Sequence, residues 1–154
     1  MAPIVVGDKI PEGTLASITE DGNVKRVSLH SLATGKKIFV FGVPAAFTLS
    51  STLQHVPDFV EKAKELKTRG MDDILLISAN EPFLLREWGK TYPNNKHVKF
   101  LADLSEKYIQ ALGLSEDMLG IRSRRFALVC DNLEIKVVNI EGGGRFEISS
   151  ADEI

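Results

Sequence analysis

The stretch Lys37-Ile38-Phe39-Val40-Phe41-Gly42-Val43 is a short, continuous apolar run, and it decides the fold class. Gly35-Lys36 precedes the run and Pro44 follows it, which is typical of a buried strand. Three further runs predict strands at 74–78, 126–130 and 134–140, the last of which partly alternates as a strand with one wetter face would. Asp131-Asn132 lies between the last two runs and predicts a hairpin.

Helical patterns lie between these strands. Apolar residues at spacings of three and four predict a helix over 52–67, with Gly70 as its stop. Two shorter helices are predicted at 82–91 and 104–112, and residues 24–29 predict part of an early hairpin. The alternation of strand and helix predicts an α/β fold with parallel strands in the centre of a mixed sheet and an antiparallel edge.

Composition and charge bound the class of protein. The chain has 154 residues, which predicts one domain over 1–154. Hydrophobic residues make up 44%, and 19 basic against 21 acidic residues give a net charge of −2. These values argue against a disordered chain and against a nucleic-acid binder. No run approaches 18 apolar residues and the N-terminus does not read as a secretory or transit signal, so we expect a cytoplasmic protein without a membrane span.

The chain has one cysteine, Cys130. A lone cysteine excludes an intrachain disulfide, a four-cysteine zinc site and an internal CxxC redox pair. The three histidines, His30, His55 and His97, lack metal-ligand spacing, so we expect no metal site. Cys130 lies in an apolar strand, which predicts a buried, inert thiol; a regulatory or dimer-linked thiol is the alternative.

The loop from Val43 to Thr52 joins the first buried strand to the first long helix. In α/β proteins such junctions are where chemistry is concentrated. Thr48 and Ser51 would lie near the positive end of the helix, among unpaired backbone N–H groups. This position stabilises an anion or lowers the pKa of a thiol.

At this loop, and at several other places, the sequence resembles the type II (atypical, plant cytosolic) peroxiredoxins. The resemblance runs nearly end to end and is carried by residues 41–44, 46–48, 55–60, 88–92, 95–103 and 122–128. It implies a thioredoxin fold without a cofactor, and a thiol peroxidase that reduces hydrogen peroxide and alkyl hydroperoxides. It also implies recycling by glutaredoxin or thioredoxin, and a homodimer.

The resemblance assigns roles to four positions. Pro44 matches the family's loop proline, Thr48 its active-site threonine and Arg125 its activating arginine, whereas the peroxidatic cysteine falls on Ser51. Other departures from the family pattern are Ala45, Leu49, Ser50 and, at the helper cysteine of many plant members, Leu76. Several neighbours differ together, which looks more like natural drift or a repurposed paralogue than one engineered change.

Ser51 decides the expected chemistry. Peroxide reduction needs a thiolate that becomes a sulfenic acid, and oxygen has no counterpart of that state. We therefore expect no ordinary peroxidase turnover. The alternative for Ser51 is structural, as the N-cap of a capping box with Gln54. A serine hydrolase with His55 as base ranks last, because the loop is not a nucleophile elbow and no acid is placed.

The remaining site residues also have structural interpretations. Thr48 either satisfies loop backbone groups or keeps its pocket role. Arg125 ends the run 122–125, which composition alone reads as a solvated basic patch; the resemblance instead points it into the pocket, to bind a hydroperoxide, carboxylate or other small anion. Phe47, Phe83 and Trp88 read as core, or by resemblance as a dimer interface. Residues 142–144, three glycines, predict a turn rather than a phosphate loop.

Two functions remain ahead of the hydrolase. The first is a type II peroxiredoxin by descent that has lost catalysis. The second is a non-catalytic binding module, which would use the Thr48 and Arg125 pocket or the dimer face to bind a partner such as an active peroxiredoxin subunit in a heterodimer.

Overall fold

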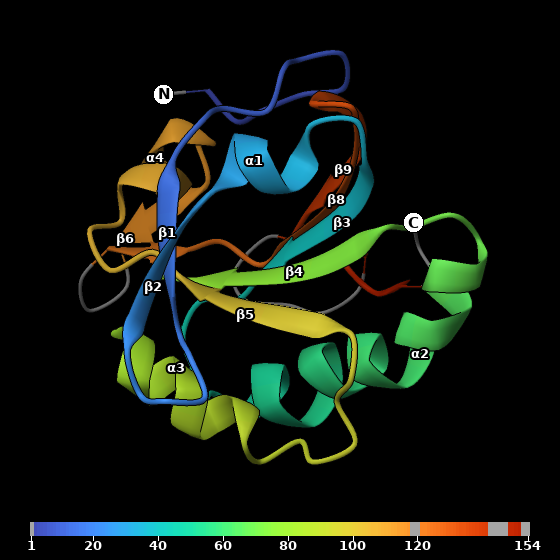
Figure 1. The fold of residues 1–154 in the computed structure, drawn as a ribbon. Helices are drawn as coiled ribbons and strands as arrows, with labels where there is room; N and C mark the ends of the chain where they lie inside the picture. The colour runs from blue at the N-terminus through green and yellow to red at the C-terminus, as the bar shows by residue number, and fades with distance from the viewer. Residues whose placement is uncertain (1, 118–120, 142–147, 152–154) are drawn as a thin grey trace.

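The structure is a computed structural model that describes residues 2–117, 121–141 and 148–151. Seven strands form one sheet in the order β2-β1-β5-β4-β3-β8-β9 (Figure 1). Their bounds are Thr14–Ile18 (β1), Val24–Ser28 (β2), Lys37–Gly42 (β3), Asp73–Ser78 (β4), Val98–Ala102 (β5), Phe126–Asp131 (β8) and Glu134–Ile140 (β9). A second, two-stranded sheet pairs β6 (Ser115–Asp117) with β7 (Ile121–Ser123).

The sheet is mixed, as predicted. β3 pairs in parallel with β4, and β4 in parallel with β5. β8 and β9 continue the sheet antiparallel on one side, and the hairpin β1–β2 closes the other side, also antiparallel. The α/β prediction with a parallel centre is therefore confirmed, including the early hairpin.

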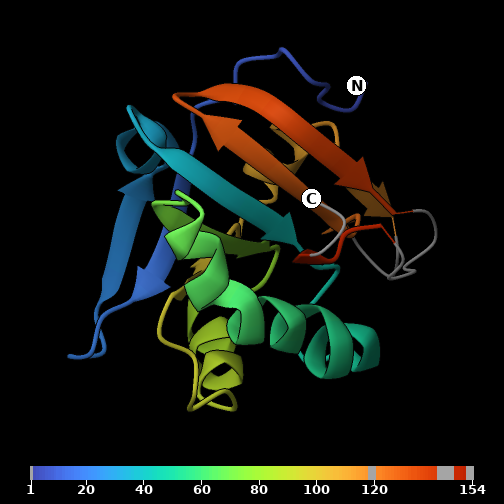
Figure 2. The same cartoon turned by 90° about the vertical axis from the view of Figure 1, so that its right-hand side faces the viewer.

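Helices cover both faces of the sheet. They are α1 (Leu29–Ala33), the π-helix η1 (Ser51–His55), α2 (Val56–Thr68), α3 (Pro82–Gly89) and α4 (Lys107–Ala111). α2 and α3 lie together on the same side of β3, β8 and β9, whereas α1 and α4 lie on the opposite side (Figures 1 and 2). None of the helices in the described part of the chain is long and apolar enough to cross a membrane.

The central strands are buried on both faces because helices cover both. Alternate residues of β3 point to opposite sides: Ile38 and Val40 join the core beneath α1 and α4, while Phe39 and Phe41 join the core beneath α2. Phe41 stacks on Phe59 of α2, with ring centroids 4.0 Å apart. This packing sets the position of the helix that carries the candidate site.

Some element boundaries differ from the prediction. The β8–β9 hairpin is confirmed, but its two turn residues are Asn132 and Leu133, whose φ angles of 44° and 74° match the right-handed twist of the strands. The sequence analysis did not predict β5 or α1. The helix expected over 104–112 begins only at Lys107, after the left-handed residue Glu106. The three glycines at 142–144 lie outside the described residues.

Candidate active site

The loop that leaves β3 is fixed by a residue that follows the end of β4, Asn80. Pro44 is buried there and restricts φ at the end of the strand. The amide oxygen of Asn80 accepts a hydrogen bond from the backbone N–H of Ala46 at 2.9 Å. Phe47 has φ of 61°, an uncommon conformation for a residue with a side chain, and its ring is half exposed. These contacts turn the chain sharply into the following helix.

The helix begins before Ser51, and this overturns the predicted capping box. Leu49 and Ser50 already have helical backbone, and Ser50 precedes the π-helix without a side-chain cap hydrogen bond. Ser51 therefore lies inside the helix, where its hydroxyl turns toward the protein interior. Gln54 instead accepts a hydrogen bond from the Ser50 hydroxyl at 3.1 Å.

Two aromatic residues stabilise the π-helical turn. A π-helix shifts the hydrogen-bond ladder by one residue, which leaves a carbonyl in need of another donor. The Tyr92 hydroxyl donates to the Thr52 carbonyl at 2.9 Å, and the Trp88 indole N–H donates to the Thr52 hydroxyl at 3.2 Å. The π-helical turn thus depends on α3 and on the residues that follow it.

Ser51, Thr48 and Arg125 meet in one buried cluster. The Ser51 hydroxyl oxygen accepts from Arg125 Nη2 at 3.0 Å and from the Thr48 hydroxyl at 2.6 Å. Thr48 also approaches the Ala45 carbonyl at 3.2 Å, so it bridges loop backbone and cluster. Ser51 is fully buried and Arg125 is 2% exposed. The one proton of the Thr48 hydroxyl can go to only one of these two acceptors at a time.

Arg125 is a buried cation aimed at position 51. Its Nη1 donates to His55 Nδ1 at 3.1 Å, and its Nε has no hydrogen-bond partner among the described residues. Burial lowers the pKa of Arg125 to about 10, and the nearby Glu141 carboxylate works in the opposite direction. The guanidinium is therefore charged at neutral pH. The interpretation of 122–125 as a uniformly solvated patch is wrong for Ser123 and Arg125, which are both buried.

His55 supports Arg125 and does not serve Ser51. Its Nε2 lies 3.0 Å from the Ser149 carbonyl, which can only accept, so Nε2 carries the proton and Nδ1 accepts from Arg125. Burial, followed by the Arg125 charge, lowers the pKa of His55 to about 3. Because the unprotonated Nδ1 accepts from Arg125, His55 is a neutral acceptor there and is not placed as a base for Ser51.

Contacts of the segment 148–151 hold His55 in place within the cluster. The buried Glu141 carboxylate accepts from the Ile148 and Ser149 backbone N–H groups and from the Ser149 hydroxyl, at 2.7–2.8 Å. The Asp58 carboxylate, on α2, accepts from the Ala151 N–H at 2.7 Å. These contacts place the Ser149 carbonyl against His55 and so orient Arg125 indirectly.

Cys130 lies away from this cluster. It is fully buried on β8, where it pairs with Ile38 of β3 and with Ile135 of β9. Burial raises the pKa of its thiol to about 11. The prediction of a buried thiol is confirmed. Leu76, at the helper position suggested by the resemblance, is buried on β4.

The cluster concentrates polar groups out of contact with water. One cation and two hydroxyl groups converge on a single buried position, where charge–dipole interactions are strong because water is excluded. No group of three or more His, Cys, Asp or Glu side chains that could hold a metal ion occurs in residues 2–117, 121–141 and 148–151. The sequence analysis missed the supporting roles of Asn80, Glu141 and Ser149, for which no local pattern exists.

The family model, the similar sequences and the similar structures all agree with one another. The Redoxin family model matches residues 5–154. Peroxiredoxin-2B of Arabidopsis thaliana and Peroxiredoxin-2C of Oryza sativa are each 54% identical over 158 residues, covering 100% of this chain and 98% of those proteins. Reduced Prx3 from Vibrio vulnificus in complex with hydrogen peroxide matches with a TM-score of 0.91 at 33% identity, over 97% of this chain and 96% of that one. Peroxiredoxin 5 from Alvinella pompejana matches with a TM-score of 0.81 at 32% identity, over 92% of each chain.

Proposed function

Because the chain belongs to the Redoxin family, and within it to the type II peroxiredoxins, we propose that it keeps the family's peroxide pocket but lacks ordinary thiol-peroxidase turnover. Family membership accounts for the thioredoxin-like fold and for a descent from thiol-dependent peroxide reduction. The proposal concerns which parts of that activity this particular chain retains. It includes one domain over 1–154 and a cytoplasmic location.

The observation that carries the proposal is the pair of hydrogen bonds onto Ser51. Thr48 and Arg125 both donate to its buried hydroxyl oxygen, at the position where the family resemblance places the nucleophile. A thiolate there would be stabilised by the same two donors. A serine hydroxyl stays protonated and forms no sulfenic acid, so the pocket can bind a hydroperoxide or small anion without reducing it.

Cys130 does not replace the missing nucleophile. The thiolate is the reactive form of cysteine, and burial raises the pKa of Cys130 to about 11. Its side chain lies in the core on the opposite face of the sheet from α2, away from the Thr48 and Arg125 groups that converge on Ser51. A reductant of the glutaredoxin or thioredoxin type, which the family uses, would accordingly find no oxidised cysteine to reduce.

Restoring the thiol tests the proposal. Wild type and Ser51→Cys are compared in a ferrous-oxidation assay of hydrogen peroxide and an alkyl hydroperoxide, with glutaredoxin or thioredoxin as reductant. We expect slow background consumption by wild type and rapid consumption by Ser51→Cys. Ser50→Cys is the matched control, because Ser50 lies one residue away and bonds to Gln54 rather than to Arg125.

Two results would contradict the proposal. Rapid, thiol-dependent peroxide consumption by wild type would show that catalysis does not need a cysteine at position 51. A folded Ser51→Cys protein that stays inactive would show that Leu49 and its neighbours have dismantled the pocket.

A second role follows from the surface around the pocket. Apolar side chains are exposed on the loop, on η1 and on α3: Phe47 at 51%, Leu49 at 76%, Leu53 at 65%, Phe83 at 45% and Leu84 at 44%. Contiguous exposed apolar residues often mark a protein interface. We include in the proposal that this face binds a second subunit, in a homodimer or in a heterodimer with an active peroxiredoxin.

Sedimentation of the protein alone and mixed with an active type II peroxiredoxin measures this association. Leu49→Glu, which replaces the most exposed of these apolar side chains with a charge, is expected to abolish it. Association that survives Leu49→Glu would rule out this face.

A further inference from the structure

A cavity of about 440 Å³ lies between the β1–β2 hairpin, β5 and α3, and Ser51, Thr48 and Arg125 are not among the residues that line it. β1 and β5 pair at a single position, Ala16 with Ala102. Beyond it the hairpin crosses the direction of β4 and β5 instead of continuing alongside them (Figure 1). The two strands therefore diverge, and the space between them is not filled by sheet pairing.

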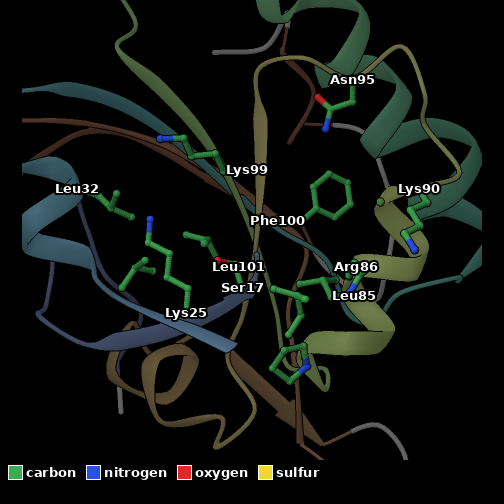
Figure 3. A pocket seen from close by; sticks show the side chains of 14 residues that line it. Ser17, Lys25, Leu32, Leu85, Arg86, Lys90, Asn95, Lys99, Phe100 and Leu101 are labelled. Carbon is green, nitrogen blue, oxygen red and sulfur yellow. The ribbon is translucent and has the colours of Figure 1, made fainter. Parts of the chain in front are cut away.

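The cavity has an apolar floor. Phe100 and Leu101 of β5, Leu85 of α3, Val27 of β2 and Leu32 of α1 contribute to its lining. Phe100 is only partly buried, and in Figure 3 its ring faces the space between the surrounding side chains. A volume of several hundred Å³ with an apolar lining is typical of a small-molecule site.

Four cations surround this floor. In the view of Figure 3, Lys25 and Lys99 lie on one side of Phe100, and Arg86 and Lys90 lie on the other. No aspartate or glutamate of the described ranges is among the lining residues. The concentration of positive charge is local, since the whole chain has a net charge of −2.

The four cations differ in their ion pairing. Lys90 is paired with Glu87 at 3.0 Å and Lys99 with Asp73 at 3.1 Å. Lys25 and Arg86 form no ion pair within residues 2–117, 121–141 and 148–151. Arg86 is partly buried, and its planar guanidinium suits bidentate contact with a carboxylate, sulfonate or phosphate.

We propose that this cavity binds an amphipathic anion: a molecule with an aromatic or alkyl body that lies on Phe100 and an acidic head group held by Arg86, with Lys25 adding attraction from the opposite side of Phe100. The apolar floor excludes a fully hydrated inorganic ion, and the cations disfavour a neutral or cationic ligand. The site is separate from the Ser51 cluster and does not depend on the function proposed for that cluster.

The only tryptophan of the chain gives a local readout of occupancy. Trp88 is fully buried on α3, and its ring centroid is 5.7 Å from that of Phe100. The probe is 1-anilinonaphthalene-8-sulfonate, which has an apolar body and one anionic group. Excitation of Trp88 is expected to give saturable emission from the bound probe. N-phenyl-1-naphthylamine, with the same body and no charge, serves as the neutral comparison.

The cations set the expected affinities. Loss of one partly exposed ion pair, about 1 kcal/mol, corresponds to about a fivefold loss of affinity. We therefore expect Arg86→Gln and Lys25→Gln each to weaken binding of the sulfonate about fivefold and to leave the neutral probe unaffected. Lys64→Gln, which removes one positive charge from an exposed position on α2, is expected to change neither. Added salt should weaken only the sulfonate.

Three outcomes would overturn the proposal. The first is equal affinity for the sulfonate and the neutral probe. The second is a sulfonate affinity unchanged in Arg86→Gln and Lys25→Gln. The third is binding abolished by Leu49→Glu, which would place the probe on the exposed apolar face beside Phe47, whose ring is 6.2 Å from Trp88.

Discussion

Replacing Ser51 by cysteine should create an acidic thiol even before any peroxide is added. The Ser51 oxygen accepts hydrogen bonds from Thr48 and from the charged Arg125, and a sulfur atom in its place would face the same donors. An exposed cysteine has a pKa of about 8.5. We expect the pKa of the introduced thiol to be well below that value.

The size of the shift can be worked from two features of the structure. Arg125 Nη2 lies 3.0 Å from the Ser51 oxygen, and about 3.5 Å is a reasonable distance to the larger sulfur. At an effective dielectric constant of about 20 this attraction is about 5 kcal/mol, or about 3.5 pKa units. Burial opposes it: Cys130, buried without a cation, has its pKa raised from 9.0 to about 11. Together these effects leave the introduced thiol near a pKa of about 7.

The rate of alkylation by iodoacetamide between pH 5 and 9 measures this pKa, because only the thiolate reacts. Ser50→Cys is the control and should titrate near the value of an exposed cysteine. Adding Arg125→Gln to Ser51→Cys removes the attraction and should raise the pKa of the thiol above about 8.5. The reasoning is refuted if the folded Ser51→Cys protein titrates at or above that value, or if Arg125→Gln leaves its pKa unchanged.

Three predictions concern stability. The pKa of His55 is lowered to about 3, so below about pH 6.5 the unfolded state binds a proton that the folded state does not. Urea unfolding should therefore show a loss of about 2 kcal/mol of stability from this group at pH 5. The stability of His55→Gln should depend less steeply on pH. The Glu81 carboxylate accepts from two backbone N–H groups at the start of α3, so Glu81→Ala should cost about 1 kcal/mol and lower the Tm by about 2–4 °C in calorimetry. A Cβ at Gly42 would lie 2.1 Å from the Phe126 ring, so Gly42→Ala should destabilise by about 1–3 kcal/mol in denaturant titration. Gly89→Ala, where the nearest atom is 3.6 Å away, should be neutral or stabilising, and equal losses in both glycine variants would argue against the steric explanation.

The elements that the sequence analysis predicted well are those with a strong local signal. β3, β4, β8 and β9 are apolar runs bounded by turn or charged residues, and α2 repeats its apolar face over three turns. β5 was missed although four of the residues 98–102 have apolar side chains. It is only five residues long, and its burial depends on neighbours far away in the sequence.

The candidate site shows the limit of local patterns more clearly. The spacing of Ser51 and Gln54 fits a capping box, yet the backbone becomes helical two residues earlier. Likewise, the charge run 122–125 reads as one surface, but the strand β8 that follows it carries Arg125 into the interior. Propensity describes what a segment prefers alone, and tertiary packing overrides it here.

By itself, the sequence determined that this protein has no cysteine at the end of the β3 loop, and that its only thiol lies in an apolar strand. Those conclusions need residue identities alone, because no arrangement of the chain converts a hydroxyl into a thiol. Only the tertiary structure decided what surrounds Ser51. Its partner Arg125 is 74 residues away in the sequence. His55 contacts that arginine and is itself held by Ser149, which is 94 residues from His55. Such contacts depend on the sheet order and on helix packing, which short-range spacing does not encode.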